Sequence, residues 1–296
     1  MKKILMIVCL MIAAKGMAAS LSTVELKIVD EAGAPIAGVE AVIIFNGEER
    51  TKYEGVTGTN GLFSAQGKIP ALVGYGGQKE GYYRSTENFK FLPDRNAPGS
   101  RIEKRTLTMR KIIEPKEGKK AGTRGVVPKL DEPLGFDILA GDWVSPYGKG
   151  VVADFVFTCA NDTTNQMASY VLTFPNTGDG IIEYPRDKKG QSIFRWPYKA
   201  PLDGYLSVLK NKEIYAFDKN TTIMSDYKTL PQEPSDIQYI FRIRTKYDSD
   251  GNIVSAFYGK ISGAIEINWN NRLRFSYWLN TDPASRSLES TNPMFP

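Results

Sequence analysis

The stretch IQYIFRIRTKY, residues 237–247, alternates apolar and polar side chains along its whole length. Such alternation is typical of a β-strand with one buried face. The turn sequence DSDGN follows at 248–252, and later alternating runs lead to RLRFSYWL at 272–279, after a candidate two-residue hairpin at Asn270-Asn271. We therefore predict an antiparallel meander over residues 237–279 that buries one of its faces.

The same alternation divides the side chains of this meander between two faces. The apolar face is predicted to hold Ile237, Tyr239, Phe241, Ile243, Tyr247, Ile253, Phe257, Ile261, Ile265, Ile267, Trp269, Leu273, Phe275, Tyr277 and Leu279. The opposite face is predicted to present Arg242, Arg244, Lys246, Tyr258, Lys260, Arg272, Arg274 and Trp278, together with Glu266 and Asn268.

This second face is the candidate binding surface. Arginine forks pair with carboxylate or sulfate groups, and aromatic rings lie against sugar faces, so the surface suits an acidic polysaccharide. Trp278 is the strongest argument, because an outward-facing indole needs a second layer or a ligand over it. The predicted binding residues are Arg242, Arg244, Tyr258, Lys260, Arg272, Arg274 and Trp278. The alternative is an ordinary solvent-exposed face whose Lys and Arg oppose aggregation.

The rest of the chain also favours strands. Short alternating or apolar runs are separated by Gly, Asn, Asp and Pro, and helical periodicity is almost absent. We predict an all-β protein with two domains: a small β-sandwich at 19–113 and a larger antiparallel β-sandwich or curved meander at 134–296. Residues 114–133 are rich in Lys, Pro and Gly, and we predict a solvent-exposed linker there.

Two motifs in the first domain carry a resemblance to a known family. VDEAGAPIAGV at 29–39 and TGTNGLF at 57–63 resemble the carboxypeptidase regulatory-like domains of bacterial exported proteins. The resemblance implies a transthyretin-like, Ig-like β-sandwich. It implies an accessory module without peptidase residues, so no catalytic position is transferred. Asn60 departs from the acidic residue that many relatives carry there.

The N-terminus has the pattern of a secretory signal peptide, which we predict at residues 1–18. Lys2 and Lys3 precede an apolar run at 4–14, and Gly16-Met17-Ala18 has the small-x-small pattern of a cleavage site. Cleavage would remove three lysines and lower the formal charge from +5 to +2, without the clustered basic excess of a nucleic-acid binder. No later run is apolar enough to span a membrane. We expect export to the periplasm, the cell surface or the medium of a bacterium.

The composition limits the possible chemistry. The chain has no histidine, which excludes Ser-His and Cys-His nucleophiles and His-ligated metal sites, so we predict no cofactor and no metal. Cys159, the one cysteine outside the signal peptide, lies in an apolar alternating run and is predicted to be buried. Asp137, Asp142 and Asp154 leave a carboxylate-only glycosidase open as a possibility, although structural roles are favoured. Asp248 and its neighbours are predicted to form a turn rather than a calcium loop.

These observations leave three functional hypotheses in order of preference. The first is an exported, non-catalytic binding or adhesion protein that holds polysaccharide on the basic and aromatic face. The second is a structural or interaction protein of the cell envelope whose partners are proteins. The third is the glycosidase, which requires two facing carboxyl groups about 5 to 9 Å apart.

Overall fold

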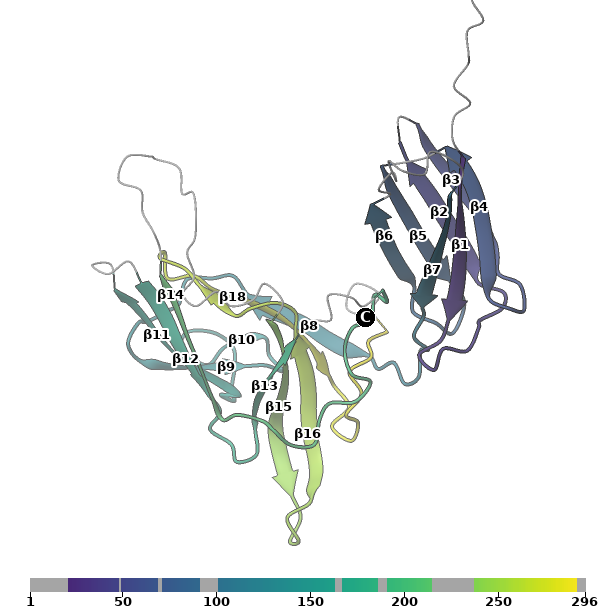
Figure 1. The fold of residues 1–296 in the computed structure, drawn as a ribbon. Coiled ribbons are helices and arrows are strands. Elements are labelled where there is room, and N and C mark those ends of the chain that lie inside the picture. The colour runs from purple at the N-terminus through teal and green to yellow at the C-terminus, as the bar shows by residue number, and fades with distance from the viewer. Residues whose placement is uncertain are drawn as a thin grey trace, which may run out of the picture. The chain divides into compact units, whose positions relative to one another are not determined.

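The computed structural model describes residues 21–47, 49–68, 71–90, 101–162, 167–185, 191–214 and 237–291, without the side chains of 211–214. The predicted signal peptide lies outside the described residues. All the regular secondary structure within these ranges consists of β-strands, which confirms the all-β prediction. None of the described residues forms a helix of the length and apolarity needed to cross a membrane. The chain divides into two compact units (Figure 1).

The first unit comprises residues up to 80 together with 84–109, and its described strands form two sheets. The three-stranded sheet has the order β4–β1–β7, with β1 antiparallel to β4 and parallel to β7. Its strands are β1 (Leu21–Val29), β4 (Leu62–Lys68) and β7 (Arg101–Thr108). The antiparallel four-stranded sheet has the order β3–β2–β5–β6. Its strands are β2 (Glu40–Asn46), β3 (Arg50–Val56), β5 (Leu72–Gln78) and β6 (Ser85–Lys90).

The two sequence motifs of this domain are bound to each other. The Thr57 hydroxyl donates to the Ile36 carbonyl at 2.8 Å and accepts from the Val39 amide at 3.0 Å. Gly61 has a φ of 71°, and a Cβ there would lie 2.5 Å from the Ile28 carbonyl oxygen, so the turn needs glycine. The predicted β-sandwich is confirmed, and membership of the carboxypeptidase regulatory-like family stays a prediction.

The second unit comprises residues 81–83 and those from 110 onward, and it is a larger sandwich. One sheet has the order β10–β9–β11–β12–β14, and the other has β13–β15–β16–β18–β17 with β8 also paired to β18. The first contains β9 (Pro133–Asp137), β10 (Asp142–Trp143), β11 (Phe155–Asp162), β12 (Met167–Thr173) and β14 (Val208–Ile214). The second contains β8 (Gly118–Thr123), β13 (Gly180–Pro185), β15 (Ile237–Tyr247), β16 (Ile253–Ile261), β17 (Glu266–Ile267) and β18 (Leu273–Asn280).

An aromatic core joins the two sheets of this domain. Phe155 of the first sheet meets Phe241 of the second edge-to-face at 5.2 Å between ring centroids. Phe136 and Phe275 form a second such pair at 5.4 Å. Cys159 is fully buried in the same core, as predicted, and burial raises the pKa of its thiol to about 12.

The predicted meander is confirmed as β15, β16 and β18, which are antiparallel neighbours. The connection expected as a two-residue hairpin at Asn270-Asn271 is a three-residue loop at 269–271, closed by the bond from the Asn268 amide to the Arg272 carbonyl. Asn271 adopts a φ of 57°, and its amide donates to the Asn268 carbonyl. Three residues predicted on the apolar face are wrong, since Tyr247 is 42% and Trp269 37% exposed and Ile253 packs against the cluster on the opposite face. Trp269 lies in the loop itself, and Tyr247 follows a register shift between β15 and β16 that ends the simple alternation.

The predicted linker at 114–133 is not a connector. Its residues 118–123 form β8, which pairs along β18 from Phe275 to Asn280. A Cβ at Gly118 would overlap the Trp278 ring, so glycine lets the backbone of β8 lie directly against that indole. The boundary between the units falls near residue 110, and the segment that looks like a linker belongs to the second domain.

Candidate functional site

The predicted binding face of the second domain is covered by protein. Arg242, Tyr258, Lys260 and Trp278 keep only 6%, 3%, 2% and 1% of their surface exposed. A second apolar cluster lies on this face, and its buried members are Tyr83, Phe194, Trp196, Ala200, Ile240, Ala256, Tyr258 and Leu288. The expectation that this face meets solvent is therefore wrong for these four residues. A sugar chain has no access to them in this structure.

Lys260 lies inside an aromatic box beneath that layer. Its Nζ donates to the Leu288 carbonyl at 2.8 Å and lies 5.0 Å from the centre of the Trp278 ring. The rings of Phe194 and Trp196 are each 5.5 Å away. Burial lowers the pKa of Lys260 to about 7, against the opposing charge of Glu289.

The two arginines of β15 are also engaged. Arg242 donates from Nε to the Gly178 carbonyl at 2.7 Å, and its guanidinium lies 4.3 Å from the centre of the Tyr205 ring. Arg244 adopts a φ of 53°, which breaks the alternation of the strand. Its guanidinium contacts Asp154 at 2.7 Å and Asp137 at 2.8 Å.

Asp137, Asp142 and Asp154, the carboxylates of the glycosidase hypothesis, all have bonding partners within the domain. Burial raises the pKa of Asp154, which the two guanidinium bonds of Arg244 oppose. Burial also acts to raise the pKa of Asp137, but three backbone amides and Arg244 outweigh it and lower that pKa. Asp142 accepts from the amides of Trp143 and Lys149. Each of the three carboxylates therefore has a structural role.

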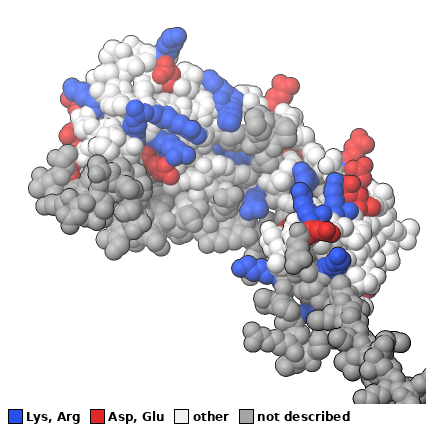
Figure 2. Space-filling view, turned by 90° about the horizontal axis from the view of Figure 1, so that it is seen from above, with Lys and Arg blue, Asp and Glu red and all other residues white. Residues whose placement is uncertain are grey.

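Arg272 and Arg274 are the predicted binding residues that stay exposed. Arg274 forms a loose ion pair with Glu266 at 3.6 Å, and both side chains are about half exposed. The alternative interpretation of an ordinary outer surface fits these two residues. The structure thus does not bring the predicted set together at one solvent-facing site. Figure 2 shows basic and acidic side chains interspersed on the face that it draws.

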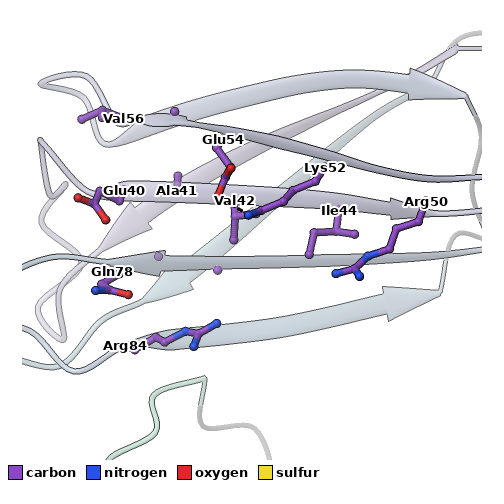
Figure 3. Close-up of a pocket in the computed structure, with 13 residues that line it drawn as sticks. Glu40, Ala41, Val42, Ile44, Arg50, Lys52, Glu54, Val56, Gln78 and Arg84 are labelled. Atoms are coloured by element: carbon purple, nitrogen blue, oxygen red, sulfur yellow. Dashed lines mark ion pairs between the residues drawn. The ribbon is translucent and has the colours of Figure 1, made fainter.

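An open hollow of about 640 Å³ lies elsewhere, on the outer face of β3–β2–β5–β6 in the first domain (Figure 3). We call this hollow the trough. It is lined by Glu40, Ala41, Val42, Ile44, Arg50, Lys52, Glu54, Gly55, Val56, Gly76, Gly77, Gln78 and Arg84. No pattern in the sequence predicted the trough. A usable signal was present, because Gly74 and Gly76 alternate with Val73, Tyr75 and Gly77 in a segment where no strand was predicted.

The floor of the trough is made by residues without large side chains. Along β5, Val73 and Tyr75 are buried in the core, so Gly74 and Gly76 face outward between them. Pairing places Gly76 between Val42 of β2 and Thr86 of β6. A Cβ on Gly74 would meet only Ile44, at 4.0 Å. A Cβ on Gly76 would lie 3.0 Å from the Ser85 carbonyl oxygen and from Thr86, so the open part of the channel floor lies at Gly74, beside an aliphatic wall on β2.

Charged side chains border this channel. Lys52 and Glu54 form an ion pair at 2.5 Å. Arg50 and Arg84 make no hydrogen bond or ion pair with any described residue. Figure 3 shows Arg50 reaching from β3 across β2 at one end, and Arg84 near Gln78 and Glu40 at the other. Two guanidinium groups are therefore available to a ligand.

A smaller hollow of about 220 Å³ lies beside Arg244 in the second domain. Its polar lining is already used, since Asp179 accepts the backbone amides of Arg244 and Thr245 at 2.7 and 2.8 Å. These bonds stabilise the irregular backbone of β15 at Arg244 and Thr245. This hollow is a consequence of the distorted strand.

Comparisons with known proteins give the chain no family. No family model and no curated protein matches it. Among solved structures, 3-chlorocatechol 1,2-dioxygenase from Rhodococcus opacus 1CP is 16% identical over 33% of this chain and 62% of its own, with a TM-score of 0.28. Two further catechol dioxygenases are spanned over 61% and 55% of their lengths.

Two longer alignments cover most of this chain. The shaft pilin SpaA from Lactobacillus rhamnosus GG is 11% identical over 92% of this chain and 96% of its own, with a TM-score of 0.25. A candidate carbohydrate binding protein from Bacteroides uniformis ATCC 8492 is 10% identical over 86% and 95%, with a TM-score of 0.22. At these TM-scores the similarities assign neither a family nor a function.

Proposed function

We propose that this protein is an exported, non-catalytic binding or adhesion protein of the bacterial envelope. In this proposal the first domain binds a polysaccharide in the trough, and the second domain serves as the scaffold. The observation that carries it is the trough itself: a flat channel on a sheet face, with two guanidinium groups that pair with none of the described residues and no buried acid, base or nucleophile among its described lining residues. Such a surface suits retention of a chain-like ligand better than catalysis.

The second domain supports the scaffold role. Its six-stranded sheet is buried on both faces, by the aromatic core on one side and by the second apolar cluster on the other. Arg242 and Lys260, which alternation places on the outer face, are both engaged by contacts within the domain. A sheet covered on both faces gives rigidity rather than a binding surface.

The test is a glycan array probed with the chain from residue 19 onward. We expect binding to at least one polysaccharide, lost in Gly74→Leu because the added side chain fills the channel. The matched control is Ser64→Leu, which adds the same side chain at an exposed position of β4 in the other sheet of the domain. A protein captured tightly from envelope extracts, with no glycan bound by the unmodified chain, would overturn the proposal in favour of an envelope interaction protein.

A further inference from the structure

The trough has its free cations at both ends rather than at one point. At one end of the trough, Arg50 on β3 pairs with Asn46 on β2. The same line of paired residues continues across the sheet through Leu72 on β5 to Lys90 on β6. At the other end, Glu40 on β2 pairs with Gln78 on β5. β6 begins beside this end of β5, since Ser85 pairs with Gly77 and Arg84 precedes Ser85. From position 40 to position 46 a strand rises about 20 Å, at about 3.3 Å per residue. The Arg50 and Arg84 side chains both extend inward over the sheet from these ends (Figure 3), so a chain-like ligand of several units can contact both guanidinium groups.

The carboxylates of the trough leave this cationic character in place. Glu54 is neutralised by its ion pair with Lys52. Glu40 is the remaining acid, against the two unpaired arginines, so the balance of unpaired charge among the lining residues is positive. Guanidinium groups bind carboxylate and sulfate in a two-point geometry, and their exposed position here costs a ligand little desolvation.

The floor favours a sugar chain over a peptide. β2 and β5 are inner strands, so their backbone N–H and C=O groups are already paired on both sides. An extended peptide gains most of its affinity by adding to such groups at a sheet edge, which the floor does not offer. Val42 and Ile44 offer aliphatic surface to the C–H faces of sugar rings, and Thr86 and Asn88 on β6 offer hydrogen bonds to hydroxyl groups.

We propose that the trough binds an acidic polysaccharide, with Arg50 and Arg84 each holding a carboxylate or sulfate group of the chain. This inference rests on the proposed function and adds the chemical class of the ligand. The Gly74 and Gly76 floor accommodates the sugar rings between the two anion-binding ends.

The experiment measures binding by biolayer interferometry to four immobilised probes: polygalacturonate, dextran sulfate, neutral dextran and polyglutamate. We expect binding to one or both acidic polysaccharides that weakens as salt is raised, because exposed charge pairs are screened. Arg50→Glu/Arg84→Glu is expected to weaken it by about ten-fold or more. Lys27→Glu/Lys68→Glu is the matched control, since it makes the same charge change at exposed positions of the three-stranded sheet and should keep affinity.

The outcomes separate this inference from the proposed function. Binding to dextran alone, unaffected by Arg50→Glu/Arg84→Glu but lost in Gly74→Leu, overturns the acidic class and keeps the polysaccharide trough. Equal binding to polyglutamate and polygalacturonate overturns the preference for a sugar. Absence of binding to every probe, together with an empty glycan array, overturns both. Thermal melting of each variant shows that it is folded before its binding is compared.

Discussion

The outer faces of two sheets in this protein begin from similar sequence patterns and end in opposite environments. On β3–β2–β5–β6 of the first domain, alternation places Val42, Lys52 and Gly74 on a face that stays open. On β15–β16–β18 of the second, alternation places Lys260 and Trp278 on a face that is closed by another layer. Alternation therefore tells which side chains share a face, but it does not tell whether that face meets water.

The two sheet faces differ because a layer of chain packs over the face of β15–β16–β18. It comes from segments without regular periodicity, and residues 192–200 and 285–290 contribute its buried members such as Phe194, Trp196 and Leu288. A backbone hydrogen bond from the Leu288 amide to the Tyr198 carbonyl ties these segments together. Irregular chain carries no pattern that assigns it to a particular sheet, so the layer was not predicted.

The largest effect is expected from removing part of this layer. Phe194 is fully buried and stacks on Tyr83 at 4.7 Å, so Phe194→Ala should destabilise the second domain by about 3–5 kcal/mol. Ile193→Ala, at a neighbouring side chain that is 41% exposed, should change stability by less than about 0.5 kcal/mol. Urea unfolding followed by tryptophan fluorescence measures both. Equal effects would show that the layer does not pack on the sheet.

A somewhat smaller loss is expected at Arg244. Arg244→Met leaves Asp137 and Asp154 without their shared partner, at a cost of about 3 kcal/mol at pH 7. The pKa of Asp137 is lowered in the fold, so its stabilisation is present above the ordinary value and is lost as the pH falls through the lowered pKa. The difference in the free energy of unfolding between Arg244→Met and the parent should therefore become smaller below about pH 4. Arg274→Met, at an exposed and loose ion pair, is the control and should be near neutral.

Lys260 is expected to destabilise the fold, in contrast to Arg244. Its pKa of about 7 in the fold lies below the value of about 10.4 in the unfolded chain. Between these values the unfolded state binds more protons, so the contribution of Lys260 to stability rises with pH. Lys260→Met should abolish this rise and stabilise the protein by about 1–3 kcal/mol at pH 6. Thermal melts from pH 6 to 10, with exposed Lys246→Met as control, test this. A parent whose melts show no such rise would contradict the buried position of Lys260.

The smallest effect is expected on the open face of the first domain. Gly74→Ala should change stability by less than about 0.5 kcal/mol, because its Cβ meets nothing closer than 4.0 Å. Gly77, on the inner face, would place a Cβ 2.9 Å from Val39 and 3.1 Å from Ile28, so Gly77→Ala should cost about 1–3 kcal/mol. Urea unfolding of the two variants gives the comparison directly. A large loss at Gly74 would show that the trough is filled.

The accuracy of the predictions follows the periodicity of the sequence. Tyr239, Phe241 and Ile243 are fully buried as the alternation predicts, because period-two spacing is a direct consequence of strand geometry. The prediction is wrong at Tyr247, beyond a register shift, and at Trp269, in a loop. The predicted linker is wrong for a related reason. Glycine and lysine in 118–123 have the composition of a connector, yet the strand is held by backbone pairing with β18, which composition does not record.

The sequence by itself determined the all-β class, the meander and the buried place of Cys159, since each depends on local spacing or on turn residues, and the sandwich of the first domain was implied by the resemblance of its two motifs. The tertiary structure alone decided that Arg242, Lys260 and Trp278 are interior groups and that the outer face of β5 is open at Gly74. The physical reason is that exposure depends on which distant segments pack over a face. That choice is made by the free energy of the whole chain, and no local pattern encodes it.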